Sequence, residues 1–355
     1  MSASIRRRRF IATAAATAAC APALITAKRT AAQDVTGQGD FQYKVKHAWP
    51  ELPSKFTWQT THNVAVDKAN RLYVIHEGVA GTEHPSIFVF DDEGRYIRSF
   101  GKQFQGGGHG IEVREENGEE FLYVAAYQQV KSFAKLSLTG ETLWQKYAPM
   151  ESGKYAEGEA SNPQKIWGRD RFMPTNFAFL DDGGFLLADG YGAFYIHRYD
   201  KDANWVSCFG GPGKGPGTFQ TAHGVWIDRR GDQPTIVVTD RARNTLQRFT
   251  LAGKYIDTLP GYGLPANLDT YEDLMIVPEL VARLTILDKD CNVLAHLGSD
   301  VDRLTADRSK SIRRDESKWQ DGKFVHPHDA CFDRQGDIFV AEWVSTGRIT
   351  KLTRV

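Results

Sequence analysis

Three histidines occupy the same place in three copies of a repeated phrase. The phrase opens with a polar residue and a short apolar run, and it returns six times along the chain. His109, His223 and His328 stand in the second, fourth and sixth copies, which lie about 120° apart in a closed ring of six units. Imidazole binds zinc and similar ions, and three protein ligands leave a fourth position open for water or substrate. The alternative is that these histidines are polar turn residues lining a wet channel.

Further candidates lie close to the same points of the repeat. His62 heads the first copy and is expected to be a wall residue, and His326 could flank the site. Tyr191 and Arg241 follow acidic residues at the ends of predicted second strands, where they could act as acid or base and as anion binder. Taken singly, each of these residue types is more often found at an ordinary surface position. The carboxylate of Asp329 could hold a hard cation deeper in the channel, or it could cap a turn.

The elements that must position these residues are short strands. The six copies open at Thr61, Gly108, Thr175, Ala222, Ala266 and Pro327. In the fourth copy, turn residues separate strand-like segments at 223–228, 235–239, 245–251 and 255–259. Units of four strands over about 45 residues are typical of propeller blades. The sequence therefore predicts an all-β, six-bladed β-propeller.

Two departures from the regular spacing carry structural information. Inserts at about 148–174 and 299–325 lie between an outer strand and the next inner strand, so we expect them to rim the mouth of the channel. The sixth blade lacks an outer strand before the chain ends. The alternating segment 41–46 has no blade of its own, and we expect it to supply that strand and close the ring.

Composition narrows the class of protein. The 355 residues carry 44 basic and 44 acidic side chains, and six basic residues but no acidic ones fall in 1–32. The remaining chain, 33–355, is therefore mildly acidic and has no electrostatic footprint for nucleic acid. The N-terminal segment combines Arg6–Arg9 with a weakly apolar run, which predicts a twin-arginine export signal and no stable membrane span. We expect a periplasmic or extracellular monomer.

Three cysteines follow the predicted signal, namely Cys208, Cys291 and Cys331. Their number is odd and their spacing fits no zinc motif. They are expected to be buried structural thiols.

The repeat resembles NHL repeats, on the strength of the phrase His223-Gly224-Val225 and the segment 238–244. Within that class, 33–355 resembles the lyase domain of peptide-amidating enzymes, the peptidyl-α-hydroxyglycine α-amidating lyases. The resemblance implies a zinc ion in the channel, a structural calcium ion below it, and cleavage of a peptidyl-hydroxyglycine to a peptide amide and glyoxylate.

The resemblance also implies roles for individual residues. The zinc ligands correspond to His109, His223 and His328, the last within the phrase Pro327-His328-Asp329. The calcium ligands correspond to the Asp329 carboxylate and the carbonyls of Val64 and Ile111. The catalytic tyrosine and arginine correspond to Tyr191, in Asp189-Gly190-Tyr191, and Arg241, in Asp240-Arg241.

The chain departs from that family at the substrate end. The family has an arginine at the end of the first blade's second strand, where this chain has Glu77. A methionine two residues before the last zinc histidine is replaced by His326, and the family's disulfide cysteines are not matched. A carboxylate in place of a carboxylate-binding arginine indicates a different substrate. We expect Glu77, His62 and His326 to face the substrate.

Three hypotheses follow for the function. The first is a zinc-dependent lyase acting on a small molecule or a peptide end. The second is a non-catalytic scaffold that binds a protein or glycan through the rim inserts. The third is a metal-dependent hydrolase or lactonase of related propeller form.

Overall fold

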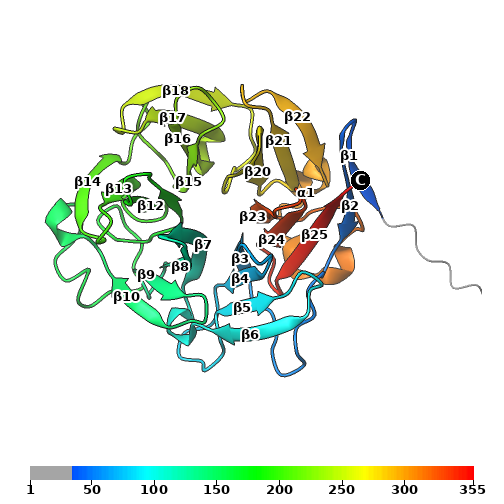
Figure 1. Ribbon diagram of the computed structural model, residues 1–355, viewed down its shortest axis with the longest axis horizontal. Coiled ribbons are helices and arrows are strands. Elements are labelled where there is room, and N and C mark those ends of the chain that lie inside the picture. The colour runs from blue at the N-terminus through cyan, green and yellow to red at the C-terminus, as the bar shows by residue number, and fades with distance from the viewer. Residues whose placement is uncertain (1–33) are drawn as a thin grey trace, which may run out of the picture. The chain divides into compact units, whose positions relative to one another are not determined.

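Six small antiparallel sheets form a ring in the computed structural model, which describes residues 34–355 (Figure 1). The predicted six-bladed β-propeller is confirmed. The predicted export signal at 1–32 lies outside the described residues. None of the helices between 34 and 355 has the length and apolar character that crossing a bilayer requires.

In blades 1 to 5 the four strands follow one another in chain order from the centre of the ring outward (Figure 1). Blade 1 contains β3 (Thr61–Val66), β4 (Leu72–His76), β5 (Ile87–Phe90) and β6 (Tyr96–Phe100). Blade 2 contains β7 (Gly108–Glu116), β8 (Glu119–Ala126), β9 (Ser132–Ser137) and β10 (Thr142–Lys146). Blade 3 contains β11 (Phe177–Phe179), β12 (Phe185–Ala188), β13 (Tyr195–Tyr199) and β14 (Trp205–Gly210).

The second half of the ring repeats this arrangement. Blade 4 contains β15 (Ala222–Asp228), β16 (Thr235–Asp240), β17 (Thr245–Thr250) and β18 (Tyr255–Pro260). Blade 5 contains β19 (Asp269–Tyr271), β20 (Leu274–Glu279), β21 (Arg283–Leu287) and β22 (Val293–Leu297). Blade 6 contains β23 (Pro327–Phe332), β24 (Ile338–Glu342) and β25 (Arg348–Arg354), followed outward by β2 (Phe41–Lys46) and β1 (Val35–Gln38).

The N-terminal strand closes the last blade, as the sequence predicts. β2 pairs antiparallel with β25, with Tyr43 opposite Arg354 and Val45 opposite Leu352. Tyr43 and Val45 are buried while Lys44 and Lys46 are exposed, which is the alternation that a strand with one buried face requires. The additional strand β1 pairs with β2 and was not predicted.

The hydrophobic core lies between neighbouring blades. Ile75 of blade 1 packs in one cluster with Val124 of blade 2, and Ala188 of blade 3 shares another with Val238 of blade 4. The second strands are buried on both faces, which explains their nearly continuous apolar composition. The wedge-shaped contacts between blades therefore hold the inner strands in fixed positions around the channel.

Short helical segments occur mainly in the inserts and connections. They are α1 (Val301–Ala306), α2 (Ser311–Arg314), η1 (Lys102–Phe104), η2 (Met150–Ser152), η3 (Arg241–Arg243) and η4 (Glu316–Lys318). The first insert is fastened to blade 2 by the buried pair of Lys131 and Glu159, whose charged atoms lie 2.7 Å apart. The second has a small apolar cluster that includes Ile312 and Val325. The three cysteines within 34–355 are free thiols. The expected burial is confirmed for Cys331 but wrong for Cys208 and Cys291, which are partly exposed because they lie on an outer strand and in the turn before β22.

Candidate metal centre

Four histidines are aimed into the channel by irregularities in the inner strands. The regular pairing register is interrupted at His62 in β3, at His109 in β7, at His223 in β15 and at His328 in β23. A bulge places an extra residue on one strand and redirects its side chain. Thus the same local device turns each imidazole out of its sheet and toward the axis.

Glycines beside the histidines allow neighbouring blades to approach each other closely. A Cβ atom on Gly110 would lie 2.1 Å from the carbonyl oxygen of Thr175, and one on Gly224 would lie 2.7 Å from Oδ1 of Asn267. Any larger residue at these points would push the blades apart. In each His-Gly phrase, the histidine reaches into the channel and the glycine leaves room for the neighbouring blade.

The four imidazoles form one buried cluster. The ring of His109 has its centroid 4.7 Å from that of His62, 4.8 Å from that of His223 and 4.9 Å from that of His328. His223 and His328 are 4.8 Å apart. Each of the four residues is at most 2% exposed. The three predicted ligands thus converge on one point of the axis, as their alternate blades require.

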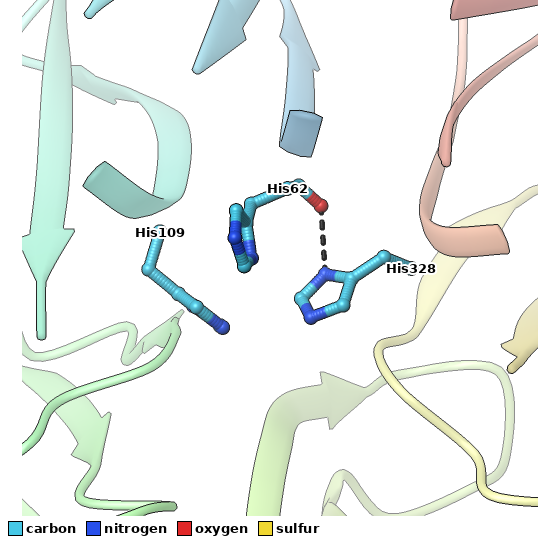
Figure 2. A group of neighbouring side chains, drawn as sticks. All are labelled: His62, His109 and His328. Atoms are coloured by element: carbon cyan, nitrogen blue, oxygen red, sulfur yellow. Dashed lines mark hydrogen bonds between the residues drawn. The ribbon is translucent and has the colours of Figure 1, made fainter. Parts of the chain in front are cut away.

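His62 belongs to this cluster more closely than expected. Ring nitrogens of His62, His109 and His328 lie within 4.8 Å of one another, and this group could hold a metal ion (Figure 2). His62 was expected in the substrate wall and His223 among the metal ligands, but the group of mutually close nitrogens contains His62 and not His223. His223 lies beside this group, with its Nε2 3.1 Å from that of His109.

Hydrogen bonds at Nδ1 distinguish the four rings. The Nδ1 atoms of His109, His223 and His328 lie 3.0, 2.7 and 2.8 Å from the carbonyl oxygens of the next blade. A carbonyl only accepts, so Nδ1 of each ring carries the proton and Nε2 offers a lone pair. Figure 2 shows one of these bonds, from His328 to the His62 carbonyl. By contrast, Nδ1 of His62 is buried without a partner in the described structure.

Two of these lone pairs face each other. Nε2 of His223 lies 3.1 Å from Nε2 of His109. Burial lowers the pKa of both rings, and of His328, well below the ordinary value of histidine, so the imidazoles are neutral. Neutral nitrogens held this close, with their other nitrogen fixed by a carbonyl, match the donor set of a protein-bound divalent metal ion.

Tyr191 and Arg241 lie directly against the histidine cluster. The Tyr191 hydroxyl is 2.9 Å from Nε2 of His223, and it accepts a hydrogen bond of 2.7 Å from Nη1 of Arg241. Nη2 of Arg241 is 3.3 Å from Nε2 of His328. Burial raises the pKa of Tyr191, although the Arg241 charge acts in the opposite direction. The predicted acid–base and anion-binding side chains thus stand side by side.

Asp189 fixes the turn that carries Tyr191. Its carboxylate accepts hydrogen bonds from the backbone of Met173 at 2.7 Å and of Ala193 at 2.6 Å. The Tyr155 hydroxyl donates to the same carboxylate at 2.9 Å. Burial raises the pKa of Asp189 to about 6. This residue holds the loop in place and does not face the channel ligands.

Glu77 follows the second strand of blade 1 and lies beside His62. Its Oε2 is 3.3 Å from Nε2 of His62, and Gln128 donates a hydrogen bond to its other oxygen. Burial raises the pKa of Glu77, but the bonds from His62, Tyr127 and Gln128 outweigh burial and the pKa is lowered. Glu77 is therefore an ionised group that is already engaged by its neighbours.

His326 lies apart from the four-histidine cluster. Its Nδ1 donates to the carbonyl of Leu280 at 2.5 Å, and its ring stands 5.9 Å from that of Trp343. Sequence proximity to His328 placed it at the site. Residues two positions apart on a regular strand face the same side, but His326 precedes β23 and the register shift at His328 breaks the alternation, so the two side chains diverge.

The predicted calcium position is the next layer of the channel. Asp329 accepts hydrogen bonds from the Val64 amide at 2.9 Å and from Asn267 at 2.6 Å. Burial raises the pKa of Asp329 to about 7. The side-chain oxygens of Asn63 and Asn176 are buried without a partner among the residues described. Val64 and Ile111 are buried on the neighbouring inner strands, and Val64 and Asp329 line a pocket of about 420 Å³ that opens from this end.

Three residues at the mouth were missed by the sequence analysis. The ring of Tyr127 lies 5.1 Å from that of His109 and 5.3 Å from that of Tyr191. Trp167, from the first insert, lies 5.6 Å from Tyr191, and Arg313, from the second, packs on Trp343. Tyr127 directly follows the second strand of its blade, as Glu77 and Arg241 follow theirs. That common position was the available signal.

Comparison with known proteins supports the fold. No family model matches the chain, and no curated protein matches it. A streptogramin B lyase structure has a TM-score of 0.53 at 12% identity, covering 88% of this chain and 97% of that one. Virginiamycin B lyase from Staphylococcus aureus has a TM-score of 0.54 at 11% identity, covering 88% and 100%. A gluconolactonase from Xanthomonas campestris has a TM-score of 0.55 at 12% identity, covering 88% and 89%.

The fold and the site together define the class. The chain is a six-bladed β-propeller with a buried histidine group that could hold a metal ion, and its structural neighbours include lyases and a gluconolactonase. At these identities the likeness concerns the fold alone. The resemblance to NHL repeats and to amidating lyases stays a prediction.

Proposed function

We propose that this protein is an exported, zinc-dependent lyase that acts at the histidine cluster of the channel. The observation that carries the proposal is the close approach of two neutral nitrogens, Nε2 of His109 and of His223, 3.1 Å apart. Both have their Nδ1 protons committed to backbone carbonyls. A shared cation relieves the repulsion between their lone pairs.

The ligand set we propose is His109, His223 and His328. These three rings share the same Nδ1-to-carbonyl support, which orients a ligand and increases its basicity. His62 lacks that support, and its Nε2 faces Glu77. His62 is therefore assigned to the substrate wall. A calcium ion on the Asp329 carboxylate and the carbonyls of Val64 and Ile111 is proposed for the layer below, where the partnerless oxygens of two asparagines suit a hard cation.

The proposed reaction cleaves a carbon–nitrogen bond next to a hydroxyl group. A divalent ion held by the three histidines supplies polarisation of a substrate oxygen. As the bond breaks, the substrate hydroxyl loses its proton and becomes a carbonyl, and the leaving nitrogen gains a proton and departs as an amide. Tyr191 transfers a proton in this step, and Arg241 stabilises the developing negative charge on oxygen.

Glyoxylate release tests this proposal. Purified protein supplied with zinc should convert N-benzoyl-α-hydroxyglycine to benzamide and glyoxylate in equal amounts, and metal-stripped protein should not. A zinc-loaded protein that leaves this compound intact contradicts the proposed reaction. The similarity to a gluconolactonase favours one alternative, a metal-dependent lactonase using the same site, which would hydrolyse δ-gluconolactone. If the protein retains no metal and accepts neither compound, the scaffold hypothesis becomes the better account.

A further inference from the structure

Arg313 is carried to the channel mouth by the second insert. The preceding residue, Ile312, is buried in a cluster with Leu304 and Val344, so the short helix α2 is anchored at this point. Nε of Arg313 donates to the carbonyl of Trp343 at 3.0 Å. Its guanidinium carbon lies 3.5 Å from the centroid of the Trp343 ring. The side chain is therefore stacked and oriented before any ligand arrives.

The terminal nitrogens of Arg313 are not engaged by a carboxylate. No ion pair of Arg313 is present among residues 34–355, although other arginines of the region have one: Arg303 pairs with Asp300 at 2.5 Å and Arg348 with Glu342 at 2.5 Å. The adjacent Arg314 is exposed and bonds the carbonyl of Ser309 at 2.9 Å. Arg313 therefore presents a guanidinium group that is stacked on an aromatic ring and bound by no carboxylate of residues 34–355.

Arg313 lies at the same end of the channel as the site. Its partner Trp343 directly follows β24, the position that Glu77 and Arg241 hold after the second strands of their blades. Arg241 also has no carboxylate partner in the described part of the chain, and its Nε is buried without a hydrogen bond. Glu77 is the acidic neighbour that acts on Arg313, and it is already bound by His62 and Gln128. The guanidinium groups of Arg241 and Arg313 thus have one nearby carboxylate, that of Glu77, whose oxygens are already hydrogen-bonded by other residues.

We propose that Arg313 is a specificity-determining residue that binds a carboxylate of the ligand at the channel mouth. This inference rests on the proposed function for the identity of the site but not for the charge of the ligand. A planar guanidinium matches a carboxylate through two parallel hydrogen bonds. The ligand class is thus a small acid, or a peptide end with a free carboxylate, whose reacting carbon lies toward Tyr191 and the histidines.

A matched pair of probes tests the inference. Titration calorimetry of the zinc-supplied and the metal-stripped protein would compare N-benzoylglycine with its neutral amide. The wild type should bind the acid more tightly than the amide. Arg313→Gln should weaken binding of the acid by about 10- to 100-fold, the change in affinity expected when hydrogen bonds to a charged group are lost. Binding of the amide should not change. Arg313→Lys should give an intermediate loss, because it keeps the charge but not the fork.

Arg314→Gln is the control, since it removes the same charge from the next residue. Its binding of both probes should equal that of the wild type. Equal affinity of the wild type for acid and amide, or an undiminished preference in Arg313→Gln, would overturn the inference. Absence of metal from the wild type would instead refute the proposed function, and the metal-stripped titrations would still decide the role of Arg313.

Discussion

The hydroxyl of Tyr191 lies 2.9 Å from Nε2 of His223, so the candidate proton carrier is in contact with a proposed metal ligand. The two residues come from blades 3 and 4 and are 32 positions apart. Arg241 bonds the same hydroxyl at 2.7 Å. This contact links the acid–base group, the anion binder and the histidine cluster into one unit.

Tyr191→Phe should abolish most of the activity and leave the metal in place. The change removes the hydroxyl that transfers a proton, an effect of about 100-fold or more on kcat. The ring and its packing against Tyr127 are retained, so KM should change little. Steady-state kinetics with metal analysis of the same sample checks this. A variant with wild-type kcat would remove Tyr191 from the mechanism.

His62→Gln and His223→Gln should differ in metal affinity. Nδ1 of His223 is hydrogen-bonded to a backbone carbonyl, as is usual for a histidine that binds a metal ion. Losing only such a hydrogen-bond partner lowers metal affinity about 10-fold or more, so replacing the histidine itself should weaken zinc binding by at least about 10-fold. The His62→Gln variant should retain zinc, because Nε2 of His62 is directed at Glu77 and is not among the proposed ligands. Competition with a zinc-binding dye measures both. The reverse order would select the alternative set that includes His62.

Tyr43→Ala should destabilise the ring by about 3 kcal/mol, because a large, fully buried side chain is lost from the closing strand. Lys44→Ala, on the exposed face of the same strand, should stay within about 0.5 kcal/mol of the wild type. Denaturant unfolding followed by tryptophan fluorescence gives both values. Similar effects of the two changes would mean that strand closure adds nothing to stability.

His47 should make ring closure sensitive to acid. It follows β2, and its Nδ1 lies 2.8 Å from the Thr350 hydroxyl of β25. Burial and then the Arg348 charge lower its pKa from 6.5 to about 4. The unfolded chain therefore binds the extra proton first, and the contribution of His47 to stability is lost as the pH falls from about 6.5 to 4.

The free energy of unfolding should fall by somewhat less than about 1.4 kcal/mol per pH unit in this window, because the imidazole of His47 is partly exposed. Other buried histidines act in the same direction, so the measurement is the difference in pH dependence between the wild type and His47→Gln. Unfolding curves at pH 4.5, 5.5 and 6.5 provide it, all roughly within the window set by the two pKa values. Parallel pH profiles would contradict the assignment.

The ring and its closure could be predicted because each rests on a local pattern. The repeated phrase marks every inner strand, and the alternation in 41–46 identifies a strand with one buried face. β1 escaped prediction because Val35–Gln38 is short, largely exposed and without alternating apolar residues. The convergence of His109, His223 and His328 followed from the symmetry of the repeat, since equivalent positions in a ring face a common axis.

The mouth of the channel could not be predicted in the same way. Arg313 lies in a strongly charged run, and the burial of Ile312 beside it depends on packing against other parts of the fold. His62 and His223 are equivalent in the phrase, and only the Nδ1 hydrogen bonds separate them. His326 lies outside the histidine cluster because it precedes β23 and bonds the Leu280 carbonyl, but its ring is 5.9 Å from that of Trp343, and its expected contact with substrate stays a prediction.

The metal content of the purified protein tests the central claim most directly. After supply of zinc and removal of loosely bound ions, mass spectrometry should find about one tightly held zinc ion at the channel site of the wild type. His109→Ala and His328→Ala, which affect both possible ligand sets, should lose it. His326→Ala should keep it, since that ring bonds the carbonyl of Leu280. A folded wild type that retains no metal, or equal metal in all four proteins, would contradict the account.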